Sequence, residues 1–320
     1  MKIIANEFVF PITEERSCHA SHILPLSDEK VFCVFFCGSR EGASDVRIYG
    51  SMRNPSNGSW STPTPISEDD GIPHWNPVLF ERRDGAVLLF YKVGDKIANW
   101  KTRCKISYDG CVSFGESFEL AENDESGGRG PVRNKAIYLK DGSILAPAST
   151  EKGEWKCFFD RSYDGGITWE KTPSLRIFQD TEMTKRGIIQ PSLWESNDGI
   201  HALMRSSEGR IYRSDSPDGQ SWSQPYPTSM PNNNSGIDLA ILPDQRLILA
   251  CNPVTKNWGA RSPLSLFVSN DNGSSFELLS HLITMPGEFS YPAVVYKNGA
   301  LHVSFTHDRK TIQYFCLTEL

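Results

Sequence analysis

The sequence lacks both a cluster of basic residues and a long run of apolar residues. Its formal net charge is -6 over 320 residues, and no basic run stands out. Nucleic-acid-binding proteins gather Lys and Arg on one surface, so this charge balance argues against a nucleic acid as partner. No apolar stretch reaches the roughly 18 residues that a membrane-spanning helix requires. We therefore expect neither nucleic acid nor membrane as a partner.

Signals for helices and for secretion are also scarce. The chain has 25 Gly and 20 Pro, and it contains few long patterns in which apolar residues recur every three or four positions, as they do in amphipathic helices. The N-terminal segment MKIIANEFVFPITEER has one Lys, an early Glu7 and no small-residue cleavage site. It does not resemble a secretory signal. These features predict an all-β protein that resides in the cytoplasm.

The eight cysteines do not form a convincing disulfide or metal pattern. Several lie inside predicted core strands, as in the segment from Val31 to Cys37. Buried free thiols are the simpler interpretation, and they fit a reducing compartment. Cys33 and Cys37 have neither the spacing nor the neighbouring ligands of a zinc site. We expect no metal and no cofactor. The cysteines are residues 18, 33, 37, 104, 111, 157, 251 and 316.

A short polar turn that ends in an aromatic residue recurs along the chain. Its clearest copy runs from Ser162 to Trp169, with Asp164 followed by Gly165 and Gly166. Adjoining Asp and Gly favour a tight hairpin, because Gly supplies a positive φ and the Asp carboxylate accepts backbone hydrogen bonds. The terminal aromatics are Trp60, Phe114, Trp169, Trp222 and Phe276, at steps of 54, 55, 53 and 54 residues. Such a constant period indicates a repeat architecture.

A second motif, a polar turn followed by an apolar strand, lies between these turns. Its apolar segments are residues 31–36, 86–91, 143–148, 200–205, 247–252 and 300–305. Each period therefore holds two hairpins, or four strands of about 5–6 residues, which is the content of a propeller blade. The sequence predicts one six-bladed β-propeller domain over residues 1–320. A strand near Ile3–Phe10 would complete the last blade and close the ring, which removes exposed sheet edges.

Polar groups also recur on the predicted first strand of every blade. Innermost strands surround the propeller axis, so these groups would line a central funnel suited to a hydrophilic ligand. In the alternative interpretation, they only satisfy one another and water along the axis. The segments are Cys18–Ser21, Trp75–Val78, Arg133–Ala136, Gln190–Leu193, Gly236–Leu239 and Ser290–Ala293.

These turns and funnel segments resemble those of the sialidases (neuraminidases) and their relatives with bacterial-neuraminidase repeats, over essentially the full length of the chain. The Asp-containing turns are moderately specific, because propellers that are not enzymes also carry them. The resemblance implies a β-propeller of sialidase type. It also implies an exo-glycosidase that hydrolyses a terminal acidic sugar, such as sialic acid, from an oligosaccharide or glycoside.

The resemblance assigns roles to five residues. In the segment from Arg40 to Asp45, which reads REGASD, Asp45 would be the general acid/base and Arg40 would bind a ring substituent. Arg205 and Arg261 would bind the substrate carboxylate. Tyr291, shortly before the last Asn-Gly turn, would be the nucleophile.

Other positions extend or depart from the family pattern. Asn76 resembles a residue that lines the acyl-amino pocket, and Arg133, beyond a Gly-rich segment, is a possible substrate contact. The first arginine of the family's triad has no counterpart, since Cys18, His19 and Ala20 stand there. Gln190 stands where the family has the Glu that assists the nucleophile, and an amide cannot take a proton.

The residue types support this chemistry independently of the family. Two converging arginines favour an anionic group, most simply a carboxylate held by paired hydrogen bonds. Tyrosine is a poor nucleophile at its ordinary pKa of about 10, but nearby Arg205 and Arg261 would lower that pKa. We suggest Asp238 as the base in place of the family's Glu. A neutral tyrosine also avoids the repulsion that a carboxylate nucleophile meets beside an anionic sugar, and Tyr glycosidases are the recognised exception to the two-carboxylate rule.

Two other functions fit the same residues. His19 and Tyr291, next to arginines that neutralise a uronate carboxylate, also describe the acid and base of a polysaccharide lyase. Alternatively, the missing arginine and Gln190 would suit a glycan-binding propeller whose enzyme site has decayed.

Overall fold

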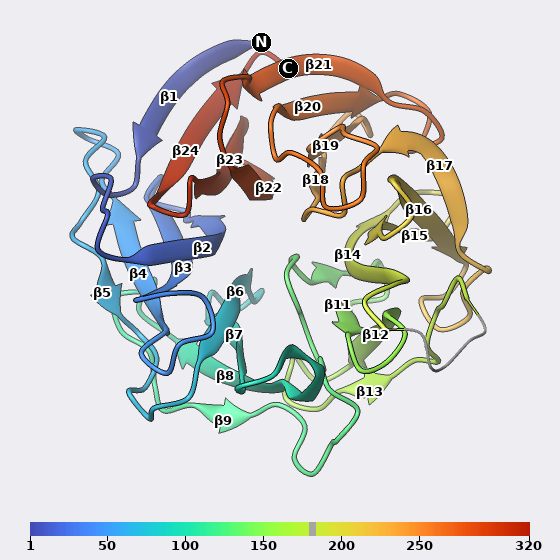
Figure 1. The fold of residues 1–320 in the computed structure, drawn as a ribbon, viewed down its shortest axis with the longest axis horizontal. Helices are drawn as coiled ribbons and strands as arrows, with labels where there is room; N and C mark the ends of the chain where they lie inside the picture. Colours follow the sequence, from blue (N-terminus) through green and yellow to red (C-terminus); the bar gives the residue numbers. More distant parts are fainter. Residues whose placement is uncertain (179–183) are drawn as a thin grey trace.

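The computed structural model describes residues 1–178 and 184–320, and six four-stranded antiparallel sheets radiate from a central axis in it (Figure 1). The first blade contains β2 (Ser17–Pro25), β3 (Val31–Gly38), β4 (Arg47–Arg53) and β5 (Thr64–Pro65). The second blade contains β6 (His74–Glu81), β7 (Val87–Val93), β8 (Lys101–Ser107) and β9 (Phe118–Glu119). The third blade contains β10 (Ile137–Tyr138), β11 (Ile144–Thr150), β12 (Lys156–Ser162) and β13 (Glu170–Lys171).

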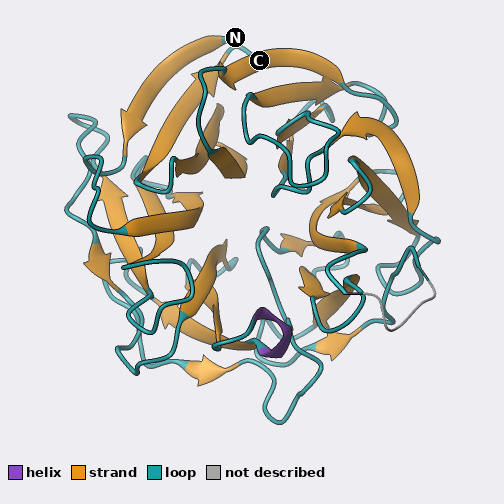
Figure 2. Cartoon of the chain, viewed as in Figure 1, coloured by secondary structure: helices purple, strands orange, loops and turns teal. Residues whose placement is uncertain are grey.

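The fourth blade contains β14 (Ile188–Glu195), β15 (Ile200–Ser206), β16 (Arg210–Ser216) and β17 (Tyr226–Pro231). The fifth blade contains β18 (Asp238–Ile241), β19 (Leu247–Cys251), β20 (Leu264–Ser269) and β21 (Glu277–Ile283). The sixth contains β22 (Phe289–Lys297), β23 (Ala300–His307), β24 (Thr311–Thr318) and β1 (Lys2–Phe8). Besides these strands, the described ranges hold the 3-10 helix η1 (Ile97–Asn99) (Figure 2). The predicted six-bladed propeller is confirmed.

The ring is closed by the two ends of the chain. Strand β1 pairs antiparallel with β24, with Lys2 opposite Thr318 and Phe8 opposite Gln313. The N- and C-termini consequently lie side by side at the outer edge of the sixth blade (Figure 1). The N-terminal closing strand predicted near Ile3–Phe10 is present, with bounds one to two residues earlier.

All six predicted apolar segments form the second strands of their blades, β3, β7, β11, β15, β19 and β23. Nearly all of their residues are buried. A strand buried on both faces contacts the blades on either side, which is why these segments are continuously apolar.

Two predicted first strands differ from the structure: in the fifth blade β18 begins only at Asp238, two residues into Gly236–Leu239, and the prediction for the third blade is wrong. In the third blade, Arg133–Ala136 precedes the two-residue strand β10 and is not itself strand. Asn134 donates through Nδ2 to the carbonyl oxygens of Gln190 (3.1 Å) and Pro191 (3.0 Å) in the fourth blade. The polar side chains of this segment bind the backbone of other blades, so it crosses the axis region instead of extending the β-ladder.

The recurring Asp turns join the third and fourth strands of their blades. In the clearest copy, Asp164 accepts hydrogen bonds from the backbone N–H groups of Ile167 (3.1 Å) and Thr168 (2.9 Å) and from the hydroxyl groups of Ser162 (2.8 Å) and Thr168 (2.6 Å). Asp109 makes the equivalent set. The carboxylate thus ties both sides of the turn together, as the sequence predicted.

The aromatic residue that ends each turn packs against the preceding blade. Trp222 of the fourth blade stacks on Phe159 of the third, with ring centroids 3.9 Å apart. Trp60 of the first blade packs on Tyr314 of the sixth. Six apolar clusters result, each shared by two neighbouring blades. The ring of clusters fixes the six inner strands relative to one another and therefore fixes the geometry of the funnel.

Candidate active site

Four of the inner strands carry a β-bulge at the same place, facing the axis. The register shifts within β2, β6, β14 and β22, and the bulge places Ala20, Asn76, Gln190 and Tyr291 at φ values of 54, 44, 54 and 56 degrees. Non-glycine residues seldom adopt positive φ, and a bulge redirects a side chain. The fold therefore repeats one backbone distortion around the axis with a different side chain at each position, and in β22 that residue is Tyr291.

Tyr291 lies at the centre of a group of cations. The guanidinium carbons of Arg133, Arg205 and Arg261 lie 5.4, 5.7 and 5.5 Å from its ring centroid. Arg205 also donates from Nη1 to the Tyr291 hydroxyl oxygen over 2.9 Å. The ring of His19 lies 4.2 Å from the ring of Tyr291, centroid to centroid. The structure thus brings together Tyr291 and three arginines, which the sequence analysis had singled out in four different blades. His19, from a fifth blade, lies beside them.

Arg205 is fixed by side chains that cannot neutralise it. It is 2% exposed, and its Nη1 donates to Gln190 Oε1 (3.1 Å) while its Nε donates to Asn234 Oδ1 (3.0 Å). Both partners are neutral amides. A guanidinium held by amides keeps its full charge for the phenol oxygen and for an incoming anion.

Arg133 has a different place from the one predicted. It is 1% exposed, and its Nη2 donates to the carbonyl oxygens of Tyr291 and Pro292, the latter over 2.8 Å. Burial lowers the pKa of Arg133 to about 10. In this geometry Arg133 supports the bulge that carries Tyr291 and lies behind the ring.

Gly236 provides the space on another side of that ring. A Cβ atom at this position would lie 3.3 Å from both the Cα and the Cγ of Tyr291. Any larger residue would press on the tyrosine, so the fifth blade contributes room at Gly236 as well as the guanidinium of Arg261.

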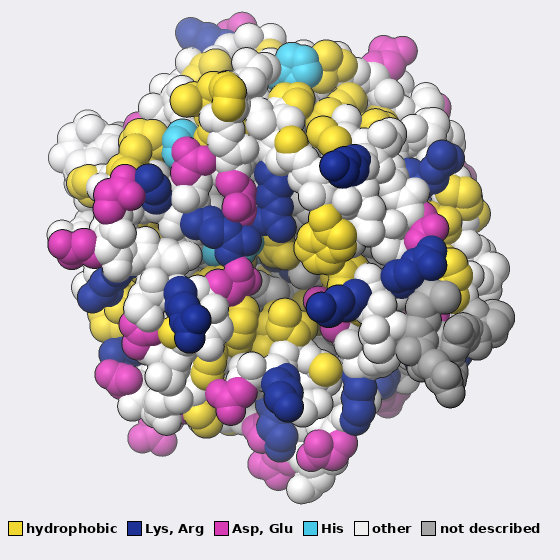
Figure 3. Space-filling model, viewed as in Figure 1, with side chains coloured by type: hydrophobic (Ala, Val, Ile, Leu, Met, Phe, Trp, Pro, Cys, Tyr) yellow, Lys and Arg dark blue, Asp and Glu magenta, His cyan; other side chains and the backbone are white. Residues whose placement is uncertain are grey.

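A network of ion pairs lies at the rim of the funnel, and we call it the rim network. Glu288 Oε1 accepts from Arg261 Nη1 (2.7 Å) and from Arg309 Nε (2.8 Å). Arg309 also pairs through Nη1 with Glu41. Cationic and anionic side chains accordingly gather around the central hollow in the space-filling view, with a histidine among them (Figure 3).

The cations set the protonation of the two central rings. Burial alone would raise the pKa of Tyr291, but the charges of Arg205 and Arg261 outweigh it and lower this pKa below its ordinary value. Burial, followed by the charge of Arg309 and then of the other arginines, lowers the pKa of His19 well below its ordinary range. Tyr291 is thereby easier to ionise than a free tyrosine, and His19 is neutral at physiological pH.

Asp238 does not contact Tyr291. Its carboxylate is fully buried and accepts from Lys135 Nζ (2.9 and 3.0 Å), from Ser192 Oγ (2.7 Å) and from the backbone N–H of Val294 (2.8 Å). These bonds join three inner strands, β14, β18 and β22, to the segment that precedes β10 near the axis. The structure gives Asp238 a structural role, and it does not place this group as the base that we suggested.

Asp45 and Arg40 lie on the exposed connection between β3 and β4. Asp45 accepts from the backbone N–H (2.9 Å) and the hydroxyl (2.8 Å) of Ser39. Burial slightly opposes ionisation, but these bonds outweigh it and lower the pKa of Asp45. The side chain of Arg40 makes no hydrogen bond or ion pair with the described part of the chain. Neither residue contacts Tyr291 in this structure.

Sequence reasoning missed Glu41, Glu151, Glu288 and Arg309. Glu41 and Glu288 stand inside the quoted motifs REGASD and EFSY, yet no role was assigned to them. Glu151 follows β11, and burial raises its pKa while Arg205 opposes the rise. Arg309 follows Asp308 in a hairpin turn, a position where a charged residue is normally solvated. Only the topology reveals that connections between second and third strands meet at this rim.

Asn76 is buried at the bulge of β6, in the funnel wall next to the first blade. The eight cysteines are free, seven of them buried, and the Sγ atoms of Cys18 and Cys37 lie 2.7 Å apart. Within residues 1–178 and 184–320, no three His, Cys, Asp or Glu side chains gather as a metal site would require, and no helix is long and apolar enough to cross a membrane.

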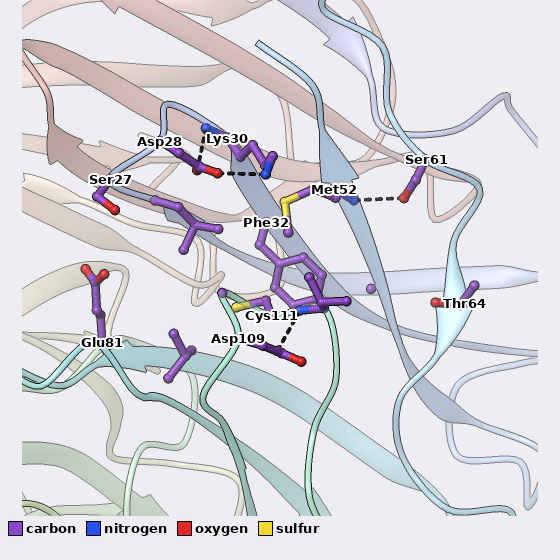
Figure 4. A pocket seen from close by; sticks show the side chains of 16 residues that line it. Ser27, Asp28, Lys30, Phe32, Met52, Ser61, Thr64, Glu81, Asp109 and Cys111 are labelled. Carbon is purple, nitrogen blue, oxygen red and sulfur yellow. Dashed lines mark hydrogen bonds and ion pairs between the residues drawn. The ribbon is translucent and has the colours of Figure 1, made fainter.

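A separate hollow of about 610 Å³ lies away from these residues, between the first and second blades (Figure 4). Its lining includes Phe32, Met52 and the turn from Asp109 to Val112. Because antiparallel strands alternate in direction, its turns lie at the opposite end of the blades from the rim network. Asp28 and Lys30 in this hollow pair with each other (2.7 Å), and it presents no comparable group of converging charges.

The comparisons with known proteins agree with the fold. The family model described as BNR repeat-like domain matches residues 29–303, whereas a search of curated proteins finds no match. Among solved structures, a protein of unknown function from Dyadobacter fermentans is 13% identical, with a TM-score of 0.80 and 99% coverage of both chains.

Two further similar structures are sialidases. The NanB sialidase of Streptococcus pneumoniae is 13% identical, with a TM-score of 0.76 over 98% of this chain and 70% of that one. The Trypanosoma rangeli sialidase in complex with the inhibitor DANA is 12% identical, with a TM-score of 0.76 over 98% of this chain and 60% of that one. The chain therefore belongs to the BNR repeat-like domain family and has the six-bladed propeller of the sialidases.

Proposed function

We propose that this protein is a sialidase-like exo-glycosidase that hydrolyses a terminal acidic sugar from a glycan, with Tyr291 as nucleophile. The observation that carries the proposal is the contact of two arginines with Tyr291: Arg205 Nη1 donates to its hydroxyl oxygen over 2.9 Å, and the guanidinium carbon of Arg261 lies 5.5 Å from its ring centroid. Their charges both stabilise a phenolate and attract an anionic sugar.

In the proposed reaction, Tyr291 first loses its phenolic proton to solvent, and the phenolate oxygen then attacks the anomeric carbon and forms a covalent bond to it. The bond from that carbon to the aglycone oxygen breaks, and a general acid gives this oxygen a proton. Water then attacks the anomeric carbon and gives a proton to the carboxylate that the general acid has become, the bond to Tyr291 breaks to regenerate the phenolate, and the sugar is released. Arg205 and Arg261 hold the substrate's carboxylate through charge-assisted hydrogen bonds. The lowered pKa of Tyr291 compensates in part for Gln190, which cannot accept the phenolic proton.

Asp45 is the proposed acid because of the family motif in which it stands. Its carboxylate must leave Ser39 to reach a substrate, and an exposed loop allows such a movement. An anionic sugar nearby would also raise its pKa toward the range in which an acid can donate. Glu151, whose pKa burial already raises, is the alternative donor.

A uronate lyase is the second candidate, and the contact between His19 and Tyr291 favours it. Neutral His19 can accept the proton next to a uronate carboxylate, and Tyr291 can protonate the leaving oxygen. This reaction forms a carbon-carbon double bond in the product and consumes no water.

The experiment that decides is a screen of acidic glycosides, including sialosides and uronides, with mass analysis of the products. Hydrolysis adds one water to the cleaved bond, whereas elimination adds none and creates a chromophore in the near ultraviolet. A sialoside or related α-keto-acid glycoside that gains water supports the proposal. Binding of acidic sugars without any turnover would instead identify the chain as a glycan-binding protein.

A further inference from the structure

Arg309 reaches the funnel from a hairpin turn, the connection between β23 and β24. The backbone N–H of Cys18 in β2 donates to the carbonyl oxygen of Arg309 over 2.7 Å, so the first blade holds this turn in place. Asp308 and Arg309 both have positive φ, 51 and 58 degrees, which turns the chain sharply here. The Arg309 side chain is 27% exposed. Arg309 is thus held at the edge of the candidate site, and part of its side chain is accessible to solvent.

Arg309 and Arg261 converge on the same point. Both donate to a single oxygen, Glu288 Oε1, over 2.8 and 2.7 Å. Two guanidinium groups that can share one carboxylate oxygen are close enough to hold the two oxygens of a ligand carboxylate. Arg309 is also the charge that lowers the pKa of His19 most, which places it on the side of the funnel where His19 and Tyr291 meet.

Glu41 occupies the other edge of Arg309, where it pairs with Nη1. Its side chain is 39% exposed and stands on the connection that joins β3 and β4. Exposed ion pairs contribute little net stability because water screens them. An anion from solution can therefore replace Glu41 on Arg309 at small cost.

We propose that Arg309, together with Arg261, binds the anionic group of the substrate, and that Glu41 is an internal competitor for the same guanidinium edge. The inference rests on the proposed function and names two more residues of that site. Arg309 contributes affinity and selects acidic ligands. Glu41 reduces binding of weakly held anions, since a ligand must displace it.

The test is calorimetric titration of the purified full chain with DANA. Arg309→Gln should weaken the affinity roughly ten- to a hundredfold, the range expected for a lost charge-assisted hydrogen bond. Arg309→Lys should recover part of that loss, because the charge remains while the planar donor edge does not. Glu41→Gln should strengthen the affinity by about two- to fivefold, as removal of a weak competing ion pair predicts.

Arg246→Gln is the matched control, since Arg246 also lies on a hairpin turn, pairs with Asp244 over 2.7 Å and is 32% exposed, but at the opposite end of its blade. It should bind DANA like the parent protein. Weaker binding after Glu41→Gln, or unchanged binding after Arg309→Gln in a protein whose melting temperature is unchanged, overturns the inference.

The same titration separates this inference from the proposed function. Arg205→Lys serves as the reference for the core of the site. If Arg205→Lys weakens binding and Arg309→Gln does not, only the role of Arg309 is wrong. If the parent protein binds neither DANA nor any acidic sugar of the screen, both the proposed function and the inference fail.

Discussion

The two faces of the disc use the same scaffold in opposite ways. On one face, the connections between third and fourth strands repeat nearly the same residues, and Asp109 and Asp164 make the same hydrogen bonds in neighbouring blades. On the other, four bulges repeat the same backbone geometry but carry Ala20, Asn76, Gln190 and Tyr291. Repetition of residues marks the positions that hold the ring together. Repetition of geometry with different residues marks the positions that make a site.

The largest effect is expected from a change in the funnel, on the face that carries the candidate site. Tyr291→Phe removes the oxygen that we propose as nucleophile and leaves the ring packed against Gly236 and His19. Turnover of an acidic glycoside should fall by roughly a thousandfold or more, as removal of a nucleophile does in other enzymes. Initial rates should be measured with a glycoside that has a sugar leaving group. A titration with DANA shows whether the variant still binds. Retained turnover would remove Tyr291 from the mechanism.

Asp45→Asn should have the next largest effect. Loss of a general acid lowers rates by about 10²- to 10⁴-fold, and the loss should shrink for activated aryl leaving groups, which need no proton. Comparing kcat for an alkyl and an aryl glycoside measures this dependence. Glu151→Gln is the matched variant, because it removes the other candidate carboxylic acid. If that variant shows the leaving-group dependence and Asp45→Asn does not, Glu151 is the acid.

The buried histidines connect the site to the stability of the fold. Burial lowers the pKa values of His19 and His22 well below the ordinary value, and that of His302 to about 4. In the unfolded chain they bind protons below about pH 6.5, while in the folded protein they stay neutral, so stability falls as the pH drops. Each contributes a slope of up to about 1.4 kcal/mol per pH unit. Chemical denaturation at several pH values between 7 and about 5 should show it, and a flat profile would contradict neutral burial.

The smallest effect belongs to the structural face. Asp164→Ala removes four hydrogen bonds from one turn and should cost about 1–2 kcal/mol of unfolding free energy. Because the turn is far from the rim network, kcat and the affinity for DANA should not change. Urea denaturation and initial rates together measure both. A large loss of activity at unchanged stability would mean that the two faces are coupled.

Sequence periodicity was sufficient for the scaffold. A constant step between turn aromatics, six apolar segments and an N-terminal strand gave the blade count and the ring closure, because each follows from local patterns of polar and apolar residues. Arg205, Arg261 and Tyr291 were found through the family resemblance. Of the three, Tyr291 lies on an inner strand, β22, whereas Arg205 lies near the end of the second strand β15 and Arg261 lies on the connection between β19 and β20. Their roles in catalysis stay predictions.

The ion pairs of the rim network could not be predicted from the sequence in the same way. Arg309 and Glu41 stand on connections between strands, where charged residues are ordinary, and their partnership spans the junction between the last and first blades. Asp238 was misjudged for a related reason. A buried carboxylate in a funnel looks catalytic until its partners, Lys135 and Ser192, are known. Which polar groups satisfy one another depends on side-chain directions that a strand pattern does not contain.

The pairing of β1 with β24 has a consequence for the order of assembly. During synthesis, β1 leaves the ribosome long before β24 and has no partner until Thr311–Thr318 has emerged. Tyr291 belongs to this sheet, so a nascent polypeptide that ends before β24 holds most of the arginines yet lacks the finished wall behind Tyr291. The turnover that we propose would then begin only after β1 and β24 have paired.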